Sequence, residues 1–471
     1  MSPPRIRPHL IVTGTVLLIA GALAISRSAS VNAHNASQNS VAQNAVNKVE
    51  QGEQIFRFDT FGDQAFWGDT LKLHQAIEGA GLGGVGPGVS PKTALAVGLK
   101  VDLDALPSNL VEQIEKDRVN LNDPAVTLAL LKLNAVIGVT GFFNSSGTLK
   151  SVGIQCELCH STVDNSNPAL CAGQITPNPG TGCIGHRLDG WPNRDLNVGG
   201  IVALAPDLSV LADLLSTDQA TVRKVLNSWG PGKFDAELVL DGKAFNPQQV
   251  TDGAVTGTNV SGATLIPPAF GLGGVNLHTW IGWGSVPHWN AFVANLEMHG
   301  KGRFFDPRLN NATQFPIAAA HGFADLPHIN PDDDLITSKL APLQLYQLSI
   351  PAPNPTVPFD KAAAARGDEL FSGKAGCNNC HAEPLWTEPG WNLHQPSEVC
   401  IDSFQADRGP DMRYRTSPIG ALSTHFKGGF YHDGRFADLN AVVNHYNSCM
   451  NLGLTDGEKS DLIQYLLSLK F

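Results

Sequence analysis

Residues 376–381 read Gly376-Cys377-Asn378-Asn379-Cys380-His381, which is the C-x-x-C-H pattern of a covalent c-type haem attachment site. In such a site two thiols bond to the porphyrin, and the adjacent histidine supplies an axial nitrogen to the iron. The pattern recurs at Cys156-Glu157-Leu158-Cys159-His160. Composition alone would give about 0.004 such matches. Two matches therefore predict two covalently bound c-type haems, attached through Cys156, Cys159, Cys377 and Cys380 and ligated by His160 and His381.

Other sites also use closely spaced cysteines, namely zinc sites and redox-active dithiols. Neither explains a histidine directly after both pairs, so haem attachment is the favoured interpretation.

The chain also contains the pattern G-x-G-x-x-G at Gly81, Gly83 and Gly86. A helical pattern precedes this run and no strand-turn-helix follows it, so it predicts a loop and not a dinucleotide site.

The composition is that of a globular protein with more than one domain. The chain has 471 residues, of which 42% are hydrophobic and 16% are charged, and this length exceeds one typical core. The 48 glycines and 31 prolines indicate much loop and little continuous sheet. A net charge of −11 argues against a nucleic-acid partner.

The N-terminus has the features of an export signal. Arg5 and Arg7 precede the apolar run Leu10–Ile25, which is short for a membrane span, and Val31-Asn32-Ala33 offers a cleavage site. Residues 1–33 are therefore predicted to be a signal peptide or, alternatively, an uncleaved anchor in the inner membrane. In both cases the remaining chain is periplasmic, and the membrane is a partner only if the segment is retained.

Four cysteines lie outside the haem motifs: Cys171, Cys183, Cys400 and Cys449. In an oxidising compartment an even remainder predicts two disulfides, and three connectivities are possible. The pairs Cys171–Cys183 and Cys400–Cys449 are preferred because each then stays within one haem domain.

Helix signals surround both motifs in the same order. Asp123-Pro124 predicts the start of a helix before the first motif, and Asp360 predicts one before the second. A closing helix follows each motif. Its start is signalled by Asp334 in the first case, with Pro342 expected to kink it, and by the capping box of Thr455 and Glu458 in the second. The inner face of the first helix is expected to carry Val126, Leu130, Leu133 and Ile137.

The predicted fold is mainly α, with two cytochrome c-like haem domains, the first enlarged by a long loop-rich insertion between Gly190 and Gly322. This insertion could be a substrate or access structure, or plain structural elaboration. Residues 34–118 form an N-terminal tether and an aromatic segment, and the part from His34 to Glu53 is expected to be disordered. The domains are residues 119–350 and 359–471, and residues 351–358 are the linker.

The segment Arg413–Asn447 resembles the C-terminal haem domain of bacterial di-haem cytochrome c peroxidases. It is more similar still to the methylamine-utilisation enzymes that mature a tryptophan quinone. The shared features are Ser417-Pro418-Ile419, then Phe430-Tyr431-His432-Asp433-Gly434, then the short helix Leu439–Tyr446. At its last position the peroxidases have a methionine bound to iron and the maturation enzymes have a tyrosine. The resemblance implies that Tyr446 is the axial ligand of the haem on His381. His445 and Met450 are the rival ligands, and a core tyrosine is the remaining alternative.

The resemblance also implies catalysis at the first haem and electron relay through the second. The leading function is a periplasmic peroxidase that uses hydrogen peroxide and is reduced by a small soluble donor of the cytochrome or cupredoxin type. The segment Ile266–Leu309 is loosely similar to di-haem rubber oxygenases, which cleave polyisoprene with O₂. An O₂-dependent oxygenase or oxidase is therefore one alternative, and a non-enzymatic di-haem electron carrier is the other.

An iron with an open sixth position can bind peroxide or O₂. Candidates to fill that position on the first haem are Met298, Met412, Met450, His186, His278, His288 and His299, although each histidine alone is more often an ordinary hydrogen-bonded side chain. Peroxide cleavage needs a nearby proton acceptor, and Glu297 and His299 are the predicted catalytic residues. Arg187 and Arg194 are candidate partners of the haem propionates, and Trp191, Trp386 and Trp391 are candidate electron relays.

Overall fold

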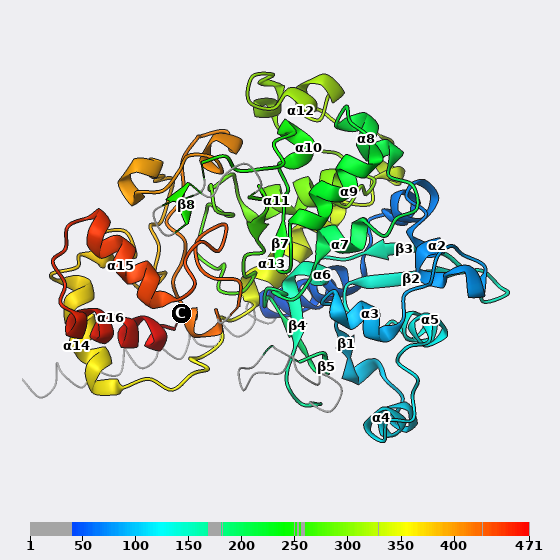
Figure 1. The fold of residues 1–471 in the computed structure, drawn as a ribbon, viewed down its shortest axis with the longest axis horizontal. Helices are drawn as coiled ribbons and strands as arrows, with labels where there is room; N and C mark the ends of the chain where they lie inside the picture. Colours follow the sequence, from blue (N-terminus) through cyan, green and yellow to red (C-terminus); the bar gives the residue numbers. More distant parts are fainter. Residues whose placement is uncertain are drawn as a thin grey trace, which may run out of the picture.

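The computed structural model describes residues 40–167, 180, 182–248, 250–251, 254–255, 260–327, 329–425 and 427–470. The described chain is mainly helical, as expected, and its strands form only two-stranded sheets. The C-terminal helices gather on one side of the molecule and the N-terminal elements on the other (Figure 1). Within these ranges no helix has the length and apolar character needed to cross a bilayer. The predictions for residues 1–33 and for Cys171 fall outside them.

The hydrophobic core has several parts. One lies around the N-terminal elements, one around α11 and α12, and one between α14, α15 and α16. The helices are residues 40–58, α2 (Leu73–Glu78), α3 (Pro91–Ala96), α4 (Ser108–Glu115), α5 (Pro124–Lys132), α6 (Glu157–His160), α7 (Val198–Val202), α8 (Ser209–Leu214), α9 (Gln219–Ser228), α10 (Leu238–Asp241), α11 (Val286–Phe292), α12 (Pro316–His321), α13 (Leu340–Ser349), α14 (Lys361–Ser372), α15 (Leu439–Cys449) and α16 (Asp456–Ser468).

The strands are short and occur mostly in the first half of the chain. They are β1 (Val101–Asp102), β2 (Val139–Phe143), β3 (Leu149–Ile154), β4 (Ser161–Val163), β5 (Ile184–Gly185), β6 (Arg187–Asp189), β7 (Lys233–Phe234), β8 (Val250–Thr251), β9 (Ala254–Val255) and β10 (Thr264–Leu265). The longest pair is the antiparallel hairpin of β2 and β3, in which Val139 lies opposite Ile154. This hairpin was not expected from the sequence, and β3 ends directly before the first haem motif.

The helices that flank the second motif form as predicted. The Asp360 carboxylate accepts a hydrogen bond from the Ala362 amide at 2.8 Å and starts α14. Thr455 and Glu458 form the capping box of α16. The two helices cross closely at Gly367, where an added Cβ would lie only 2.2 Å from the Asp461 carbonyl oxygen.

The N-terminal segment differs from its prediction. Residues 40–58 are helical, although their Asn, Ser and Gln content predicts a disordered tether up to residue 53. The helix packs on α13 through Gly52, where an added Cβ would lie 2.1 Å from the Pro342 carbonyl oxygen. The rings of Phe56 and Tyr346 complete the contact, with centroids 5.4 Å apart. This buried contact stabilises the helix, and composition does not reveal it.

The two helix crossings repeat each other. In α14 and α16 the ring centroids of Phe371 and Tyr465 lie 5.2 Å apart, close to the 5.4 Å between Phe56 and Tyr346 in the first crossing. The local sequences agree, since Gly52-Glu53-Gln54-Ile55-Phe56 corresponds to Gly367-Asp368-Glu369-Leu370-Phe371. The counterpart of α14 is therefore the helix of residues 40–58, and not α5. This packing favours a first unit that begins before the predicted boundary at residue 119.

Helix α5 is capped by Asp123 as predicted, but its inner face differs from the expected one. The helix ends at Lys132, so Leu133 is 37% exposed, and Ile137 is buried beyond the helix.

Helix α13 begins at Leu340, later than expected, because Asp334 caps a separate turn at Thr337. Pro342 therefore lies in the first turn, where its missing N–H breaks no helical hydrogen bond, and the expected kink has no cause.

Helix α15 contains the predicted segment Leu439–Tyr446, and Asp438 caps it through the Ala441 amide at 2.8 Å. A disulfide joins Cys449, at its last turn, to Cys400, as predicted, with 5.9 Å between the Cα atoms. Cys183 is also disulfide-bonded, and its predicted partner Cys171 lies outside the described residues. The Cys400–Cys449 bond fixes the helix that carries Tyr446 to the loop after the second motif.

Candidate functional site

The first haem motif is held by a buried network of charged side chains. Glu157, inside the motif, accepts hydrogen bonds from the Gly138 amide at 3.0 Å and from Arg187 at 2.5 Å. Arg187 also donates to Asp102 at 2.7 Å. The guanidinium predicted as a propionate partner thus has two protein carboxylates as partners. The network instead fixes α6, which carries Cys159 and His160.

The two motif histidines have matching environments. The Nδ1 atom of His160 lies 3.1 Å from the Pro267 carbonyl oxygen, and that of His381 lies 3.0 Å from the Trp386 carbonyl oxygen. Burial lowers the pKa of His160 to about 4 and also lowers the pKa of His381, so both rings are neutral. With the proton on Nδ1 donated to the carbonyl, the Nε2 lone pair is available to a metal.

The motif cysteines also fit covalent haem. Cys156, Cys159, Cys377 and Cys380 are free thiols, and burial raises the pKa of Cys156 and Cys159 to about 12 and of Cys377 to about 11. They are therefore neutral thiols without a disulfide within either pair. Each motif thus presents two thiols and one imidazole nitrogen, which is the donor set of a c-type haem.

A large cavity of about 310 Å³ opens beside Cys156, Cys159 and His160. Both π-helical segments of the described chain, Ala65–Thr70 and Val293–Glu297, contribute to its wall. Such segments often occur at functional sites. Most of the wall is apolar and includes Phe66, Trp67, Leu226, Trp229, Phe234, Leu265, Ile266, Ile281, Trp289, Val293 and Ala294. Its size and apolar wall suit a large flat cofactor.

The two predicted catalytic residues both line this cavity. Helix α11 continues into the π-helical segment, which ends at Glu297 and is followed by Met298 and His299. The Glu297 Oε1 atom is buried and has no hydrogen-bond partner among the described residues. Burial, reinforced by Glu237 and Asp235, raises the pKa of Glu297 well above its usual range. Burial therefore favours the protonated form of Glu297 at the cavity wall.

His299 lies beside it in a constrained position. Its φ is 60°, a left-handed conformation, and its ring stacks on Phe66 with centroids 3.6 Å apart. Burial lowers the pKa of His299 to about 4, so the ring is neutral. The stacking fixes the ring against the wall formed by the first π-helical segment.

The other candidates for the sixth ligand fall into two groups. Met298 and His278 line the cavity, and His278 has its Nε2 atom 3.1 Å from the Val275 carbonyl oxygen. His186 and His288 do not line it, because they pair with Asp104 at 2.9 Å and with Asp306 at 3.0 Å. The structure thus brings His278, Met298 and His299 together at one cavity.

Several cavity residues were not expected from the sequence: Asp235, Glu237, Trp280, Gln405 and Arg415. Arg415 donates to the Leu277 carbonyl at 2.8 Å, and the Trp280 Nε1 donates to the Leu265 carbonyl at 3.0 Å. Arg415 belongs to the segment of family resemblance, which was a usable signal. Asp235, Glu237 and Gln405 have no motif around them, so only the fold reveals their place.

No family model matches the sequence. The chain is 27% identical over 187 residues to cytochrome-c peroxidase IdrP1 of Denitromonas iodatirespirans, a match that covers 28% of this chain and half of the peroxidase. It is 25% identical over 281 residues to the methylamine utilization protein MauG of Methylorubrum extorquens, which covers 50% of this chain and 78% of MauG. The resemblance to the di-haem peroxidase and MauG family is confirmed.

Two solved structures are also similar. One is a MauG-like protein associated with microbial copper homeostasis, with 15% identity, a TM-score of 0.30, and coverage of 48% of this chain and 79% of that protein. The other is the diheme peroxidase BthA of Burkholderia thailandensis E264, with 14% identity, a TM-score of 0.29, and coverage of 51% of this chain and 78% of BthA.

The residue that the peroxidase and MauG resemblance assigns to the second iron is Tyr446. Burial raises its pKa, a hydrogen bond with Tyr431 opposes this rise, and the nearby thiols of Cys377 and Cys380 add to it, so the hydroxyl lies close to the second motif. The rival His445 has its Nε2 atom 2.8 Å from the Val399 carbonyl oxygen, and the rival Met450 is 44% exposed. Of the three candidate ligands, Tyr446 is the one whose side chain lies close to the motif thiols.

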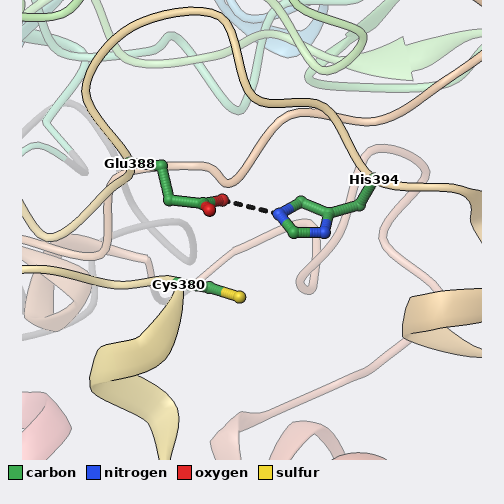
Figure 2. Close-up of side chains that lie close together, drawn as sticks. All are labelled: Cys380, Glu388 and His394. Atoms are coloured by element: carbon green, nitrogen blue, oxygen red, sulfur yellow. Dashed lines mark hydrogen bonds and ion pairs between the residues drawn. The ribbon is translucent and has the colours of Figure 1, made fainter.

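A second cluster of possible metal donors lies at the same motif. Cys380, Glu388 and His394 bring three donor atoms within 4.8 Å of one another, as Figure 2 shows. The His394 Nε2 atom bonds to Glu388 at 2.5 Å, and its Nδ1 atom to Glu398 at 2.7 Å. A thiol bonded to a haem cannot also act as a metal-binding thiolate, so this cluster and a covalent haem exclude each other.

Arg194 remains a candidate propionate partner. Its Nη2 atom lies 2.5 Å from His425 Nε2, while Nε and Nη1 are buried and without partners in the described part of the chain. Burial lowers the pKa of Arg194 to about 9.

Of the candidate relay residues, Trp391 is 75% exposed, whereas Trp386 is buried and donates to the Lys470 carbonyl at 2.8 Å.

Proposed function

We propose that this chain is a periplasmic di-haem c-type oxidoreductase that reduces hydrogen peroxide, with the reaction in the cavity beside His160. The observation that carries the proposal is that a neutral imidazole and a protonated carboxyl group, His160 and Glu297, line the same largely apolar cavity. The similarity to a cytochrome-c peroxidase and to MauG supports it. When bound, two haems would supply the redox chemistry, one beside each C-x-x-C-H motif.

The residues of the chain have separate roles in this proposal. Cys156 and Cys159 hold one haem and Cys377 and Cys380 the other, while His160 and His381 offer Nε2 to the irons. The carbonyl groups of Pro267 and Trp386 fix the two imidazole rings. Tyr446 is proposed as the oxygen ligand of the second iron, which favours its ferric state. The second site then stores or relays electrons from a small soluble donor.

Glu297 handles protons in the cavity. Reduction of hydrogen peroxide to water needs a group that accepts a proton from one oxygen and returns a proton to the leaving oxygen. A protonated carboxyl group can do both, because its carbonyl oxygen accepts a proton while its hydroxyl donates one, and Glu297 presents an unpartnered oxygen for this purpose. The stacked ring of His299 and the apolar wall limit the water that enters, and His299 is proposed as a second catalytic side chain.

Turnover of a reduced donor by the purified holoprotein tests the proposal, with hydrogen peroxide and O₂ compared as oxidants. Glu297→Gln is expected to lower kcat/KM for peroxide by about 10²- to 10⁴-fold, the usual contribution of general acid–base catalysis. Asp63→Asn is the matched control, because Asp63 is also a fully buried carboxyl group but does not line the cavity. Unchanged peroxide turnover in Glu297→Gln would refute the role of this residue.

One observation favours the alternative, an O₂-dependent oxygenase. A separate cavity of about 80 Å³, lined mainly by apolar side chains, shares Ile154 and Leu158 with the wall of the larger one. Apolar cavities take up small apolar molecules. Turnover with O₂ but not with peroxide would establish this alternative, and turnover with neither would leave an electron carrier.

Export and covalent attachment have their own test. The mass of the mature protein is expected to equal that of the chain from about His34 plus two haem groups. A haem-free product in the cytoplasm would contradict the proposed localisation and cofactors together.

A further inference from the structure

A group of buried polar side chains lies next to Glu297. It consists of Asp235 and Glu237, just before α10, and Asp241, at the end of α10, together with Gln405 and Arg408 from the second half of the chain; we call it the Arg408 cluster. All five side chains are nearly inaccessible, with exposures of 2%, 4%, 6%, 2% and 0%. Three of them, Asp235, Glu237 and Gln405, also line the cavity beside His160.

Arg408 binds two of the three carboxylates directly. It donates to Asp241 through Nε at 2.8 Å and through Nη2 at 3.1 Å, and Nη2 also lies 2.8 Å from Asp235. Glu237 receives only a neutral donor, the Gln405 amide at 3.0 Å. Glu237 is thus the acid of the cluster without a direct bond to the cation.

The charges of this region do not balance without protons. One guanidinium faces the three acids of the Arg408 cluster, and Glu297 adds a fourth acid with no cation bonded to it. Uncompensated charges in a buried site cost several kcal/mol each, and carboxyl groups there take up protons instead. The acids of this region outnumber the cations bonded to them, and this excess favours the retention of protons.

The unpartnered atoms of the cluster show where these protons are available. Asp235 Oδ2, Glu237 Oε2 and Gln405 Oε1 are buried and lack a hydrogen-bond partner within the described residues, and the same is true of Glu297 Oε1. These carboxylate oxygens do not form a metal site, because within the described chain three donors approach within 4.8 Å only at Cys380, Glu388 and His394. Water in the cavity can instead bridge these atoms and carry protons between them.

We propose that the Arg408 cluster is a proton store for the reaction in the cavity, and that Glu297 passes its protons to the substrate. The inference rests on the proposed peroxide reduction. In that reaction the O–O bond of hydrogen peroxide breaks, two electrons come from the donor protein, and two protons complete two molecules of water. Glu297 supplies one of these protons and the other enters with water from the solvent; Glu297 is then recharged from Glu237, the acid of the cluster without a direct bond to Arg408.

Infrared spectroscopy of the holoprotein tests whether Glu237 holds a proton. Glu237→Gln should remove absorption by a protonated carboxylic acid at pH 6, while keeping the acceptor for the Gln405 amide. Burial, opposed by Arg408 and reinforced by Asp235 and Asp241, raises the pKa of Glu237 to about 7, so the band should fade in the wild type as the pH rises beyond that value. An unchanged carboxylic acid band in Glu237→Gln would overturn the proposal.

Kinetics separate a proton store from a structural role. With pre-reduced protein, Glu237→Gln should leave the first turnover of peroxide unchanged and lower the steady-state rate by about tenfold or more, since only recharging of Glu297 is lost. Glu237→Asp should restore part of the steady-state rate, and Asp63→Asn should change neither. Equal slowing of both phases would overturn the store. Absence of any peroxide turnover in the wild type would instead overturn the proposed function, and the proton store with it.

Discussion

Tyr446 and His445 occupy adjacent positions of α15, and the helix turns their side chains by about 100° relative to each other. His445 is bound to the Val399 carbonyl, so Tyr446 is the side chain left beside Cys377 and Cys380. A phenolate oxygen is a hard anionic donor that favours ferric over ferrous iron. If it ligates the second haem, this residue alone lowers the reduction potential of the site relative to methionine.

Tyr446→Phe should therefore change the ferric absorption spectrum and raise the potential of one haem by on the order of 0.1 V, within the range that axial ligands control. Spectroelectrochemical titration of the holoprotein measures both effects. His445→Ala is the control and should leave the potential in place. A spectrum that changes in His445→Ala or Met450→Ala, but not in Tyr446→Phe, would move the assignment to the rival residue.

Glu237 also affects stability through its proton. Its pKa is raised from 4.5 to about 7 in the folded protein, so between these values the folded chain binds more protons than the unfolded chain. Stability is therefore lost as the pH rises from about 4.5 to 7. The shift corresponds to up to about 3 kcal/mol above pH 7.

Glu237→Gln should remove this penalty. Relative to the wild type, the variant should gain little at pH 4 and up to about 3 kcal/mol at pH 8, measured as the shift in the urea unfolding midpoint. A pH-independent difference between the two proteins would show that Glu237 is ionised in the folded state.

At the scale of whole helices, the close crossings at Gly52 and Gly367 set the packing of two helix pairs. In each, a glycine allows two backbones to approach, and a Phe–Tyr contact covers the next turn. Any added Cβ would collide with a carbonyl oxygen of the partner helix, which cannot move away without displacing the helix.

Gly52→Ala and Gly367→Ala should each destabilise the protein by roughly 1–3 kcal/mol through overpacking. Gly457→Ala in α16 is the matched control, because nothing lies within 4 Å of its added Cβ. This variant should instead gain up to about 1 kcal/mol from helix propensity. Thermal unfolding of the three variants decides the matter, and destabilisation by Gly457→Ala alone would contradict the proposed crossings.

These elements also show what could be predicted from the sequence. The haem motifs, the caps at Asp360 and Thr455, and the Cys400–Cys449 disulfide depend on local signals or simple counting, and they were predicted. The helix of residues 40–58 was missed because a tertiary contact with α13 stabilises it, and the polar composition of residues 34–53 indicates the opposite. As a result, α5 was predicted to be the opening helix of the first haem domain, a role that the helix of residues 40–58 fills.

The residues of the candidate site also fall into those that the sequence could predict and those that it could not. Cys156, Cys159, His160, Glu297 and His299 were selected from motifs and local sequence, and they line one cavity. The Arg408 cluster could not be found, because its salt bridge joins Asp241 to Arg408, 167 residues further along the chain. A buried acid and a solvated acid look alike in a sequence, and only the fold distinguishes them.

Across the whole molecule, the environments of the two haem motifs are unequal. The cavity of about 310 Å³ lies beside His160, whereas Tyr446 lies beside the second motif. An open position for an external ligand is therefore expected at the first site alone.

Cyanide or carbon monoxide should bind at one haem per chain, and His160→Ala should abolish that binding while His381→Ala should preserve it. Optical titration of each purified variant, with haem content determined in parallel, measures the stoichiometry. Loss of binding in His381→Ala, with retention in His160→Ala, would reverse the roles of the two sites.

The repeated helix crossing has a consequence for the order in which the chain acquires its structure. Gly367 and Tyr465 meet across about a hundred residues, while Gly52 and Tyr346 are separated by nearly three hundred. Closing a loop three times longer costs only about 1 kcal/mol more, so the difference matters little for final stability. It matters for timing, because contacts distant in sequence form slowly. In the proposed export, the first motif would reach the periplasm long before its closing helix, so its thiols would stay unburied for longer than those of the second motif.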